Sequence, residues 1–472
     1  MIELQAKQVA QAVGGRLIAC EADARRVVRG ITWDSRQVAE GNIFLALPGQ
    51  RVDGNDFVTA AVQAGAGAVI CTREPSSSLM AIAGEFACPI IVVRDAQAAL
   101  TSLARAWRRR LHAVVVGVTG SSGKTSTKDF LAALLAQRFK TCATQGNHNN
   151  ELGVPATVLA ADADTEVLVV EMGMRGQGQI AELCEFVHPS IGVVTNVGMS
   201  HLELLGSQEA IARAKGELYA ALPRTGLAVL PADDPYAPFL AECGKLAERG
   251  VQTLSCGFSP EADVRAGEPT FDEAACASFE LAVRGRGSAT VQLAMPGRHS
   301  VANALAAAAV GSYLGMTPTE IATGLSQARP SGMRMEVRRS REGVTIVNDA
   351  YNANPDSVRA SLATLAGMAC TGRRIAVLGD MGELGPTERE LHGQVGQQAA
   401  RSGLDLLVCV GTLSECTRAG ALEAGMAEQA VRWFPSLEGV QEFLASTLAT
   451  GDLVLVKASR FMGMERLVEG MV

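Results

Sequence analysis

The stretch that most constrains the fold is residues 112–136, HAVVVGVTGSSGKTSTKDFLAALLA. Its first part, His112 to Val118, is a short apolar run rich in β-branched residues, which predicts a buried strand. Phe130 to Leu135 then carries apolar residues at helical spacing. A strand therefore enters a turn of Gly and Ser residues and leaves it as a helix.

The turn TGSSGKTS can wrap a polyphosphate. Small residues let backbone N–H groups approach a phosphate, the start of a helix favours negative charge, and Lys124 adds a full positive charge. Thr125 would place its hydroxyl on Mg²⁺. The general P-loop pattern needs glycine where this chain has Val118, so a Gly-rich turn without a ligand is the alternative. The candidate nucleotide-binding residues are Gly120, Ser121, Ser122, Gly123, Lys124, Thr125 and Ser126.

Composition describes a globular chain of 472 residues, 48% hydrophobic and 19% charged. A net charge of −7 argues against a general nucleic-acid binder, and the basic run WRRR at 107–110 is interpreted as a solvated helix face. No apolar run approaches the roughly 18 residues of a membrane span, and the N-terminus lacks a signal-peptide pattern. The 11 cysteines are spread singly. We expect a cytoplasmic protein with buried, unreactive thiols.

Patterning divides the chain into three expected domains, at residues 1–93, 94–326 and 327–472. The first is a small α/β unit, and the second carries the TGSSGKTS turn. In the third, the apolar runs VTIVND, RIAVLGD, LDLLVCVG and DLVLVKASR alternate with helical segments. This alternation predicts βα units and a mostly parallel sheet. The expected fold class is therefore α/β throughout.

Two polar residues follow apolar strand patterns in the expected central domain. Glu171 ends EVLVVE, and His201 follows SIGVVT and the loop NVGMS. Ligand-binding side chains gather at the carboxyl ends of parallel strands, which puts Thr125, Glu171 and His201 on one rim. They make a candidate Mg²⁺ site, although a His ligand is unusual for this ion. A structural or solvated role is the alternative for His201.

Two polar loops allow two interpretations each. The loop that holds Asp34, Ser35 and Arg36 lies beside a strand and could bond a sugar, uracil or phosphate, or form a turn with a surface salt bridge. The loop TQGNHNNELGVP, residues 144–155, has amide side chains that suit a polar substrate or a turn. Its candidate residues are Asn147, Asn149 and Asn150.

Four further residues are also open to two interpretations. Lys215 lies on an expected helix and is by default a solvated cation. Asn303, on an Ala-rich helix, is a structural hydrogen-bonder or an adenine contact. Asp349 and Asp380 end apolar strands, where each could face a ligand or cap a helix.

The chain resembles the Mur ligases over essentially its whole length. The motifs that carry the resemblance are DSRQVAEGNIFLAL, TGSSGKTS, TQGNHNNELGVP, EMGMRGQGQI, TNVGMSHLELLGSQEAIARAKGEL, PGRHSVANALAA, SGMRME, NDAYNANPDS, VLGDMGELG and KASRFMGMERL. NNELGVP, NDAYNANPDS and GDMGELG resemble the branch that adds a dipeptide. Branches that add single amino acids typically carry a His-containing stretch in place of YNANP.

The resemblance implies three α/β domains: one that grips a UDP-linked substrate, a central ATPase domain, and a C-terminal Rossmann-like domain that closes over ATP. It implies a monomeric ligase, using ATP and Mg²⁺, that joins D-alanyl-D-alanine to UDP-MurNAc-tripeptide through an acyl phosphate during peptidoglycan precursor synthesis. Alternatives are a folylpolyglutamate synthase, which the DSR region disfavours, and a single-amino-acid Mur ligase, which YNANP disfavours. A P-loop switch protein would leave the flanking domains unexplained.

The resemblance also implies roles for single residues. Lys124 and the turn around it would hold the β- and γ-phosphates, and Lys215 matches a lysine that the family carries as a carbamate. The implied Mg²⁺ residues are Thr125, Glu171, His201 and Lys215. The implied adenine, phosphate and ribose contacts are Asn303, Arg334 and Asp349. Asp34, Ser35 and Arg36 match the uridine-binding region, and residues expected near the dipeptide are Asn352, Asn354, Lys457 and Arg460.

Overall fold

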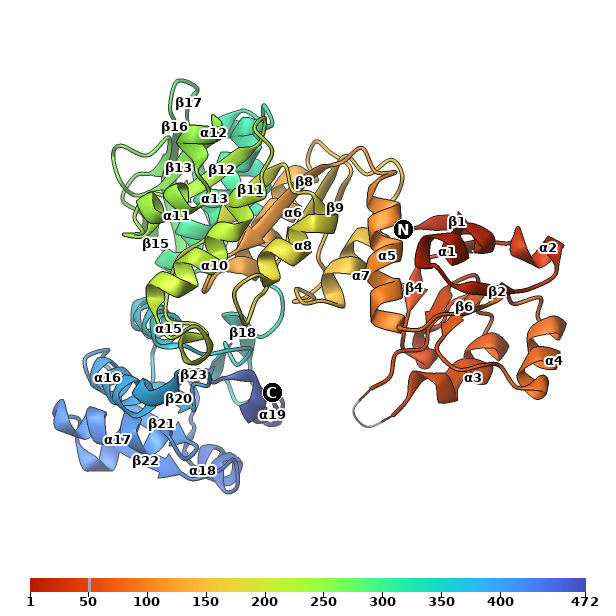
Figure 1. The fold of residues 1–472 in the computed structure, drawn as a ribbon. Coiled ribbons are helices and arrows are strands. Elements are labelled where there is room, and N and C mark those ends of the chain that lie inside the picture. The colour runs from red at the N-terminus through yellow and green to blue at the C-terminus, as the bar shows by residue number, and fades with distance from the viewer. Residues whose placement is uncertain (50–51) are drawn as a thin grey trace. The chain divides into compact units, whose positions relative to one another are not determined.

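The structure is a computed structural model that describes residues 1–49 and 52–472 (Figure 1). The chain forms two compact units. The first comprises Met1–Gly117, Arg138–Gly173 and Ala181–Ser190, and the second comprises Val118–Gln137, Met174–Ile180 and Ile191–Val472. Strand β8 (Val114–Thr119) and helix α8 (Gln179–Val187) run from one unit into the other.

The first unit is built on a sheet with strand order β2-β7-β6-β5-β4, in which β4 to β7 are parallel and β2 is antiparallel. In the same unit β1 and β3 form a two-stranded antiparallel sheet, and β9 is the parallel neighbour of β10 at the edge of the ten-stranded sheet. Phe44, Val62 and Ile90 belong to one buried cluster between the sheet and helix α3. The strands are β1 (Glu3–Gln5), β2 (Arg16–Ile18), β3 (Val27–Arg29), β4 (Ile31–Thr32), β5 (Ile43–Leu45), β6 (Ala68–Cys71), β7 (Ile90–Val92), β9 (Thr141–Ala143) and β10 (Val167–Glu171). The helices are α1 (Ala6–Val13), α2 (Glu21–Ala24), α3 (Val58–Gln63), α4 (Ser77–Glu85), α5 (Ala96–Arg108) and α7 (Gly153–Ala160).

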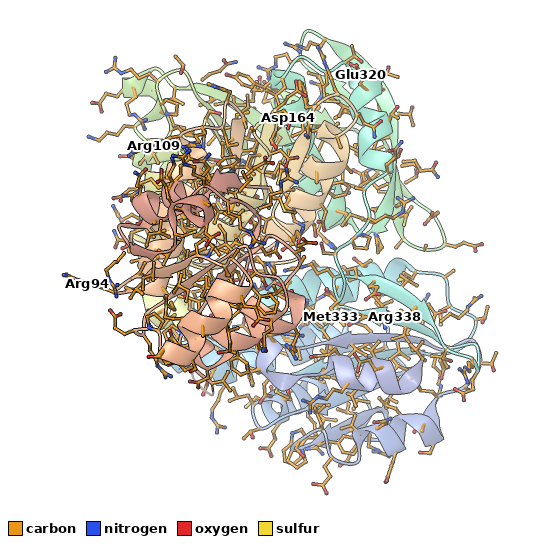
Figure 2. The ribbon with its side chains drawn as sticks, turned by 90° about the vertical axis from the view of Figure 1, so that its right-hand side faces the viewer. Arg94, Arg109, Asp164, Glu320, Met333 and Arg338 are labelled. Atoms are coloured by element: carbon orange, nitrogen blue, oxygen red, sulfur yellow. The ribbon has the colours of Figure 1, made fainter. Side chains whose placement is uncertain are left out.

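Helix α5 ends in the basic run at 107–110. Asp95 caps its start by accepting a hydrogen bond from Ala98 N. Arg109 is exposed, as expected for a solvated face (Figure 2), but Trp107 is buried, so the expectation is wrong for it. The expectation is also wrong for Arg108, whose half-buried guanidinium donates to the carbonyls of Val187 and Leu111.

The second unit contains the parallel strands β11, β12, β13 and β14 in sheet order, followed by antiparallel β16 with β15 and β17 beside it. The hairpin between β16 and β17 turns at residues 284–286. The Ala-rich helix α13 is buried along most of its length and packs against α6. The strands are β11 (Ile191–Val194), β12 (Leu227–Pro231), β13 (Gln252–Gly257), β14 (Val264–Ala266), β15 (Thr270–Phe271), β16 (Cys276–Val283) and β17 (Gly287–Pro296). The helices are α6 (Lys124–Leu135), α9 (Leu202–Leu205), α10 (Gln208–Ala220), α11 (Ala237–Cys243), α12 (Leu246–Arg249), α13 (Arg298–Tyr313) and α14 (Pro318–Ser326).

The same unit carries a C-terminal sheet with strand order β18-β19-β23-β20-β21-β22, parallel except for β18. Successive side chains of β20 enter opposite clusters: Ala376 packs with α15 and α16, and Val377 packs with α18 and α19. Both faces are therefore covered, which is why these strands read as continuous apolar runs. The strands are β18 (Glu336–Arg339), β19 (Thr345–Asn348), β20 (Arg374–Gly379), β21 (Leu406–Val410), β22 (Val431–Phe434) and β23 (Leu453–Lys457). The helices are α15 (Pro355–Gly367), α16 (Glu388–Ala400), α17 (Ser414–Glu423), α18 (Val440–Thr447) and α19 (Glu465–Met471).

The structure confirms the predicted α/β class, and none of the helices it describes is long and apolar enough to cross a bilayer. The thiols agree only in part with expectation. Burial raises the pKa of Cys88 and of Cys256 to about 12, as expected for inert thiols. Cys20 is exposed, because it precedes the short surface helix α2, and the prediction of burial is wrong for it.

Candidate functional site

The turn between β8 and α6 depends on two glycines. Gly120 has φ +149° and Gly123 has φ +77°, a region that L side chains rarely adopt. A Cβ at Gly120 would lie 1.8 Å from Thr195 Oγ1, and a Cβ at Gly123 would lie 2.3 Å from Asn303 Oδ1. Glycine is therefore required at both positions, by conformation and by the close approach of a neighbour.

The loop after β11 holds the turn in shape. Ser121 N donates to Asn196 O at 3.1 Å, and Ser122 N donates to Asn196 Oδ1 at 3.0 Å. Thr195 Oγ1 donates to Ser122 O at 2.5 Å. Two N–H groups that the sequence assigns to a phosphate thus bond to Asn196 in this structure.

Lys124 and Thr125 open α6, as predicted. Lys124 Nζ donates to Gly120 O at 2.8 Å, so the ammonium group lies folded over the turn. Thr125 is buried, and Ser126 follows it on the same helix with partial exposure. A positive charge is therefore held at a helix N-terminus, where an anion is favoured.

Lys215 does not behave as a solvated cation. It lies on α10 with 1% of its surface exposed, and burial, with a smaller contribution from Lys124, lowers its pKa well below the usual value. The solvated alternative is therefore wrong. Lys215 lies in register with Ile211 and Leu218 on the apolar stripe of the helix, a signal that the sequence already contained.

His201 pairs with a residue that sequence reasoning did not single out. Its Nδ1 lies 2.5 Å from Glu383 Oε2, and Arg175 Nε lies 3.7 Å from the same carboxylate. The hydrogen bond with His201 is the main cause that lowers the pKa of Glu383. Glu383 belongs to the GDMGELG motif, but the motif alone gave no hint of this contact.

Glu171 and the Asn-rich loop lie in the first unit. The fully buried Glu171 carboxylate accepts a hydrogen bond from Asn149 Nδ2 at 2.7 Å, so the Asn149 amide bonds a carboxylate of the same chain. Asn150 Oδ1 instead accepts from Gly153 N at 2.9 Å at the start of α7, which is the turn role. Asn147 is half-buried, and its carbonyl accepts from Asn149 N. The structure shows the turn role for Asn150, and a substrate role for the three asparagines stays a prediction.

The expected metal residues are divided between the two units, Glu171 in the first and Thr125, His201 and Lys215 in the second. Among residues 1–49 and 52–472, no group of three or more His, Cys, Asp or Glu side chains could hold a metal ion. The assignment of these four residues to Mg²⁺ therefore stays a prediction.

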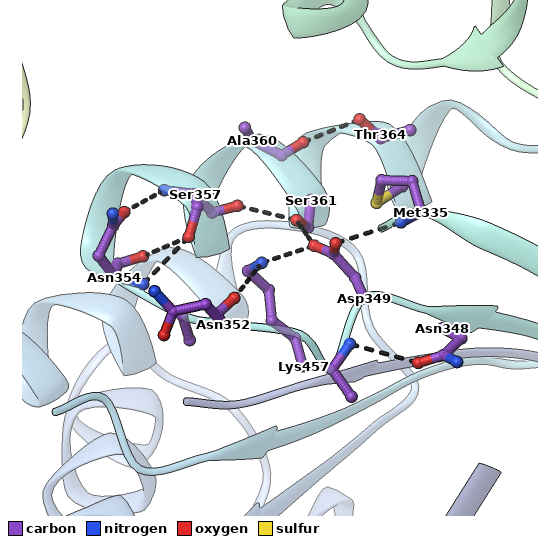
Figure 3. A network of polar contacts seen from close by, with 12 residues as sticks. Met335, Asn348, Asp349, Asn352, Asn354, Ser357, Ala360, Ser361, Thr364 and Lys457 are labelled. Atoms are coloured by element: carbon purple, nitrogen blue, oxygen red, sulfur yellow. Dashed lines mark hydrogen bonds and ion pairs between the residues drawn. The ribbon is translucent and has the colours of Figure 1, made fainter. Parts of the chain in front are cut away.

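Asp349 is the centre of a buried network at the end of β19 (Figure 3). Its carboxylate accepts from Lys457 Nζ and from Ser361 Oγ, each at 2.6 Å, and from Met335 N at 3.1 Å. Lys457 Nζ also donates to the carbonyl of exposed Asn352 at 3.0 Å. The ionic group at this strand end thus already has a buried partner.

Neither strand-end aspartate is an N-cap residue, although Asp380 bonds the start of α17, whose N-cap is Leu413. Asp380 accepts from Ser414 N at 2.7 Å and from Leu413 N at 3.2 Å, at the start of α17. Asp349 caps no helix, since the N-cap of the nearby α15 is Asn354.

Two arginines approach Tyr351. The Arg334 guanidinium lies 4.1 Å from the ring centroid, and the exposed Arg460 lies 6.0 Å from it and 3.1 Å from Glu465. Arg334 is flanked by Met333, at φ +62°, a position marked in Figure 2. Such a conformation is rare outside glycine, and here it turns the chain at the entrance to the C-terminal sheet.

The candidate uridine loop forms the surface salt bridge that the sequence left as an alternative. Arg36 Nη2 lies 2.7 Å from Asp34 Oδ2, and the Arg36 side chain is 86% exposed. The hydrogen bond from the Arg36 side chain lowers the pKa of Asp34 to about 2. Ser35, which stands between these two residues in the sequence, begins the short 3-10 turn Ser35–Gln37.

Known protein families and curated relatives match this chain along its whole length. Family models match in order: Mur ligase family, catalytic domain, at residues 27–108; Mur ligase middle domain at 118–311; and Mur ligase, glutamate ligase domain, at 333–460. UDP-N-acetylmuramoyl-tripeptide–D-alanyl-D-alanine ligase of Mycobacterium tuberculosis is 40% identical, covering 100% of this chain and 98% of the relative. The Bacillus subtilis protein of the same name is 34% identical, covering 100% and 99%.

The fold of this chain also matches solved structures. MurF from Acinetobacter baumannii superposes with a TM-score of 0.85 at 30% identity, covering 100% of this chain and 99% of that one. MurF ligase from Thermotoga maritima in complex with ADP has a TM-score of 0.77 at 31% identity, covering 94% and 97%. Sequence and structure lead to one conclusion: the chain belongs to the Mur ligase family.

Proposed function

We propose that the protein joins D-alanyl-D-alanine to UDP-N-acetylmuramoyl-tripeptide in an ATP-dependent reaction. The observation that carries this proposal is the match, over the full chain and at 33–40% identity, to relatives named for that ligation. The motifs of the dipeptide-adding branch, NNELGVP and YNANP, give it further support. We place the reaction in the cytoplasm, as the last peptide-addition step there in peptidoglycan precursor synthesis, carried out by a monomer.

The proposed work is divided among three domains. Residues 1–93 bind the UDP end of the substrate through Asp34, Ser35 and Arg36. Residues 94–326 bind ATP, and residues 327–472 close over ATP and bring the dipeptide. Asn147, Asn149 and Asn150 serve the substrate in the central domain, and Asn352, Asn354, Lys457 and Arg460 lie near the dipeptide.

The proposed chemistry begins with activation of a carboxylate. The terminal phosphoryl group of ATP passes to the substrate carboxylate, giving an acyl phosphate and ADP; the amine of the dipeptide then attacks the carbonyl, and phosphate leaves. Lys124 and the turn 120–126 hold the phosphates, where charge builds up on the transferring oxygens. Asn303, which lies against Gly123, is suited to an adenine contact, with Arg334 on a phosphate and Asp349 on the ribose.

The proposed metal residues fit Mg²⁺ by their donor chemistry. Thr125 offers a hydroxyl, Glu171 a carboxylate and a carbamate on Lys215 an anionic oxygen, and hard cations prefer oxygen. His201 contributes a nitrogen. The Glu171 carboxylate supports this assignment because it offers an anionic oxygen, the donor type that Mg²⁺ prefers. Bound Mg²⁺ would neutralise charge on the phosphate oxygens.

The decisive experiment measures phosphate release from ATP, Mg²⁺ and UDP-MurNAc-tripeptide, with and without D-alanyl-D-alanine. We expect release to require all components, and the product mass to show the pentapeptide. Tripeptides ending in meso-diaminopimelate or lysine, run in parallel, identify the natural substrate. Release that needs neither the carboxylate nor the amine would favour a nucleotide switch, and release with a single amino acid would favour another branch of the family.

Gly123→Ala is expected to weaken ADP binding roughly tenfold, which corresponds to about 1.4 kcal/mol. The new Cβ would collide with Asn303 as well as strain the backbone. Titration calorimetry on the full chain measures the affinity. The matched control is Gly206→Ala, because Gly206 has φ +78° and open space around its Cβ position. Equal loss of affinity in both variants would contradict the assignment of the turn to the nucleotide.

A further inference from the structure

The hydroxyl of Ser200 connects the turn at 120–123 to the first turn of α15. Ser200 Oγ donates to Ser121 O at 3.1 Å and accepts from Asn354 Nδ2 at 2.5 Å. All three side chains are buried, with 7%, 8% and 6% of Ser121, Ser200 and Asn354 exposed. Water therefore has little access to replace either bond.

The direction of these bonds is fixed by the cap of α15. Asn354 Oδ1 accepts from Ser357 N at 2.8 Å, so the amide nitrogen of Asn354 is the group that faces Ser200. That amide nitrogen can only donate, which leaves the single Ser200 proton for Ser121 O. A change in the position of Asn354 is thus transmitted to the carbonyl of Ser121 through one shared hydroxyl.

A second set of contacts confines the same segment. Gly198 N donates to Ser121 Oγ at 2.8 Å, and Met199 N donates to Asp356 Oδ2 at 3.3 Å. A Cβ at Gly198 would lie 2.6 Å from Asp356 Oδ2 and 3.4 Å from Ser121 Cβ. Residues 198–200 therefore contact both the turn and the first turn of α15.

We propose that Asn354 is a positioning residue that acts through Ser200 on the turn at 120–123. Docking of α15 then stabilises the nucleotide-binding shape of the turn, and bound nucleotide in return favours docking, because a coupling between two sites is reciprocal. This inference rests on the nucleotide role proposed above for residues 120–126.

The test measures the affinity of the full-length protein for ADP by titration calorimetry. Asn354→Ser keeps an N-cap oxygen for α15 but removes the amide donor. Since a buried hydrogen bond contributes roughly 0.5–1.5 kcal/mol, we expect ADP binding to weaken roughly 2- to 13-fold. Ser200→Ala should weaken it by a similar factor. The double variant should lose no more than the larger single effect, because both changes interrupt one chain of bonds.

Ser357→Ala is the matched control. It weakens the capping box of α15 and leaves the bond between Asn354 and Ser200 in place. It should lower the thermal midpoint while ADP affinity stays at the wild-type value. Unchanged ADP affinity in Asn354→Ser, or additive losses in the double variant, would overturn the coupling. Absence of ADP binding in the wild type would instead overturn the nucleotide role itself.

Discussion

Replacing Lys124 with alanine is expected to lower kcat by roughly 10²–10³-fold. Lys124 opens α6 and places its ammonium over the turn, where charge builds up on the transferring phosphoryl group. The turn itself should survive, since Asn196 bonds both Ser121 and Ser122. Phosphate release measures the rate, and a thermal unfolding scan checks the fold.

Lys140→Ala is the control for this experiment. Lys140 is a half-exposed lysine that pairs with Asp162 and Asp164, away from the turn in sequence. The Lys140→Ala substitution removes the same positive charge as Lys124→Ala, and this variant should keep wild-type turnover. A Lys124→Ala enzyme that also turns over at the wild-type rate would remove Lys124 from the mechanism.

Lys215→Met should lower turnover about as strongly as Lys124→Ala does, without unfolding the protein. Methionine approximates the shape of lysine without the buried amine, so the thermal midpoint should hold or rise. Burial lowers the pKa of Lys215, which leaves more of the amine neutral near pH 7. Only the neutral amine reacts with CO₂ to form a carbamate, so acid should disfavour the modification.

Wild-type activity should accordingly depend on dissolved CO₂. Turnover in buffer stripped of bicarbonate is expected to fall and to recover when bicarbonate is restored, whereas Lys215→Met should not respond. A wild-type rate that is unchanged without bicarbonate would exclude the carbamate. A Lys215→Met variant that stays active would exclude the metal role of Lys215.

The fold could be predicted because its strands are short and buried on both faces. SIGVVT became β11 and RIAVLG became β20, since an apolar run of that length has few other solutions in an α/β chain. The register of Lys215 on the apolar stripe of α10 was also readable. The default interpretation of lysine as solvated outweighed it.

Pairings between distant residues could not be predicted. His201 meets Glu383 across 182 positions, and Ser200 meets Asn354 across 154. Periodicity reports which face of an element is buried, but it does not report which element covers that face. The same limit explains why the strand-end rule placed Asp349 and Asp380 at a ligand-facing rim, while the structure gives both of them protein partners.

If Arg36 binds a phosphate, as proposed, its contact with Asp34 must be given up first. An approaching phosphate meets a guanidinium that already has a carboxylate beside it, so capture there is an exchange of one anion for another. Exposed charge pairs contribute little, which makes the exchange easy. Ionic strength should therefore weaken the contact of Arg36 with Asp34 and its contact with a phosphate alike. The shape of the ligand, rather than its charge, would then determine which molecule binds.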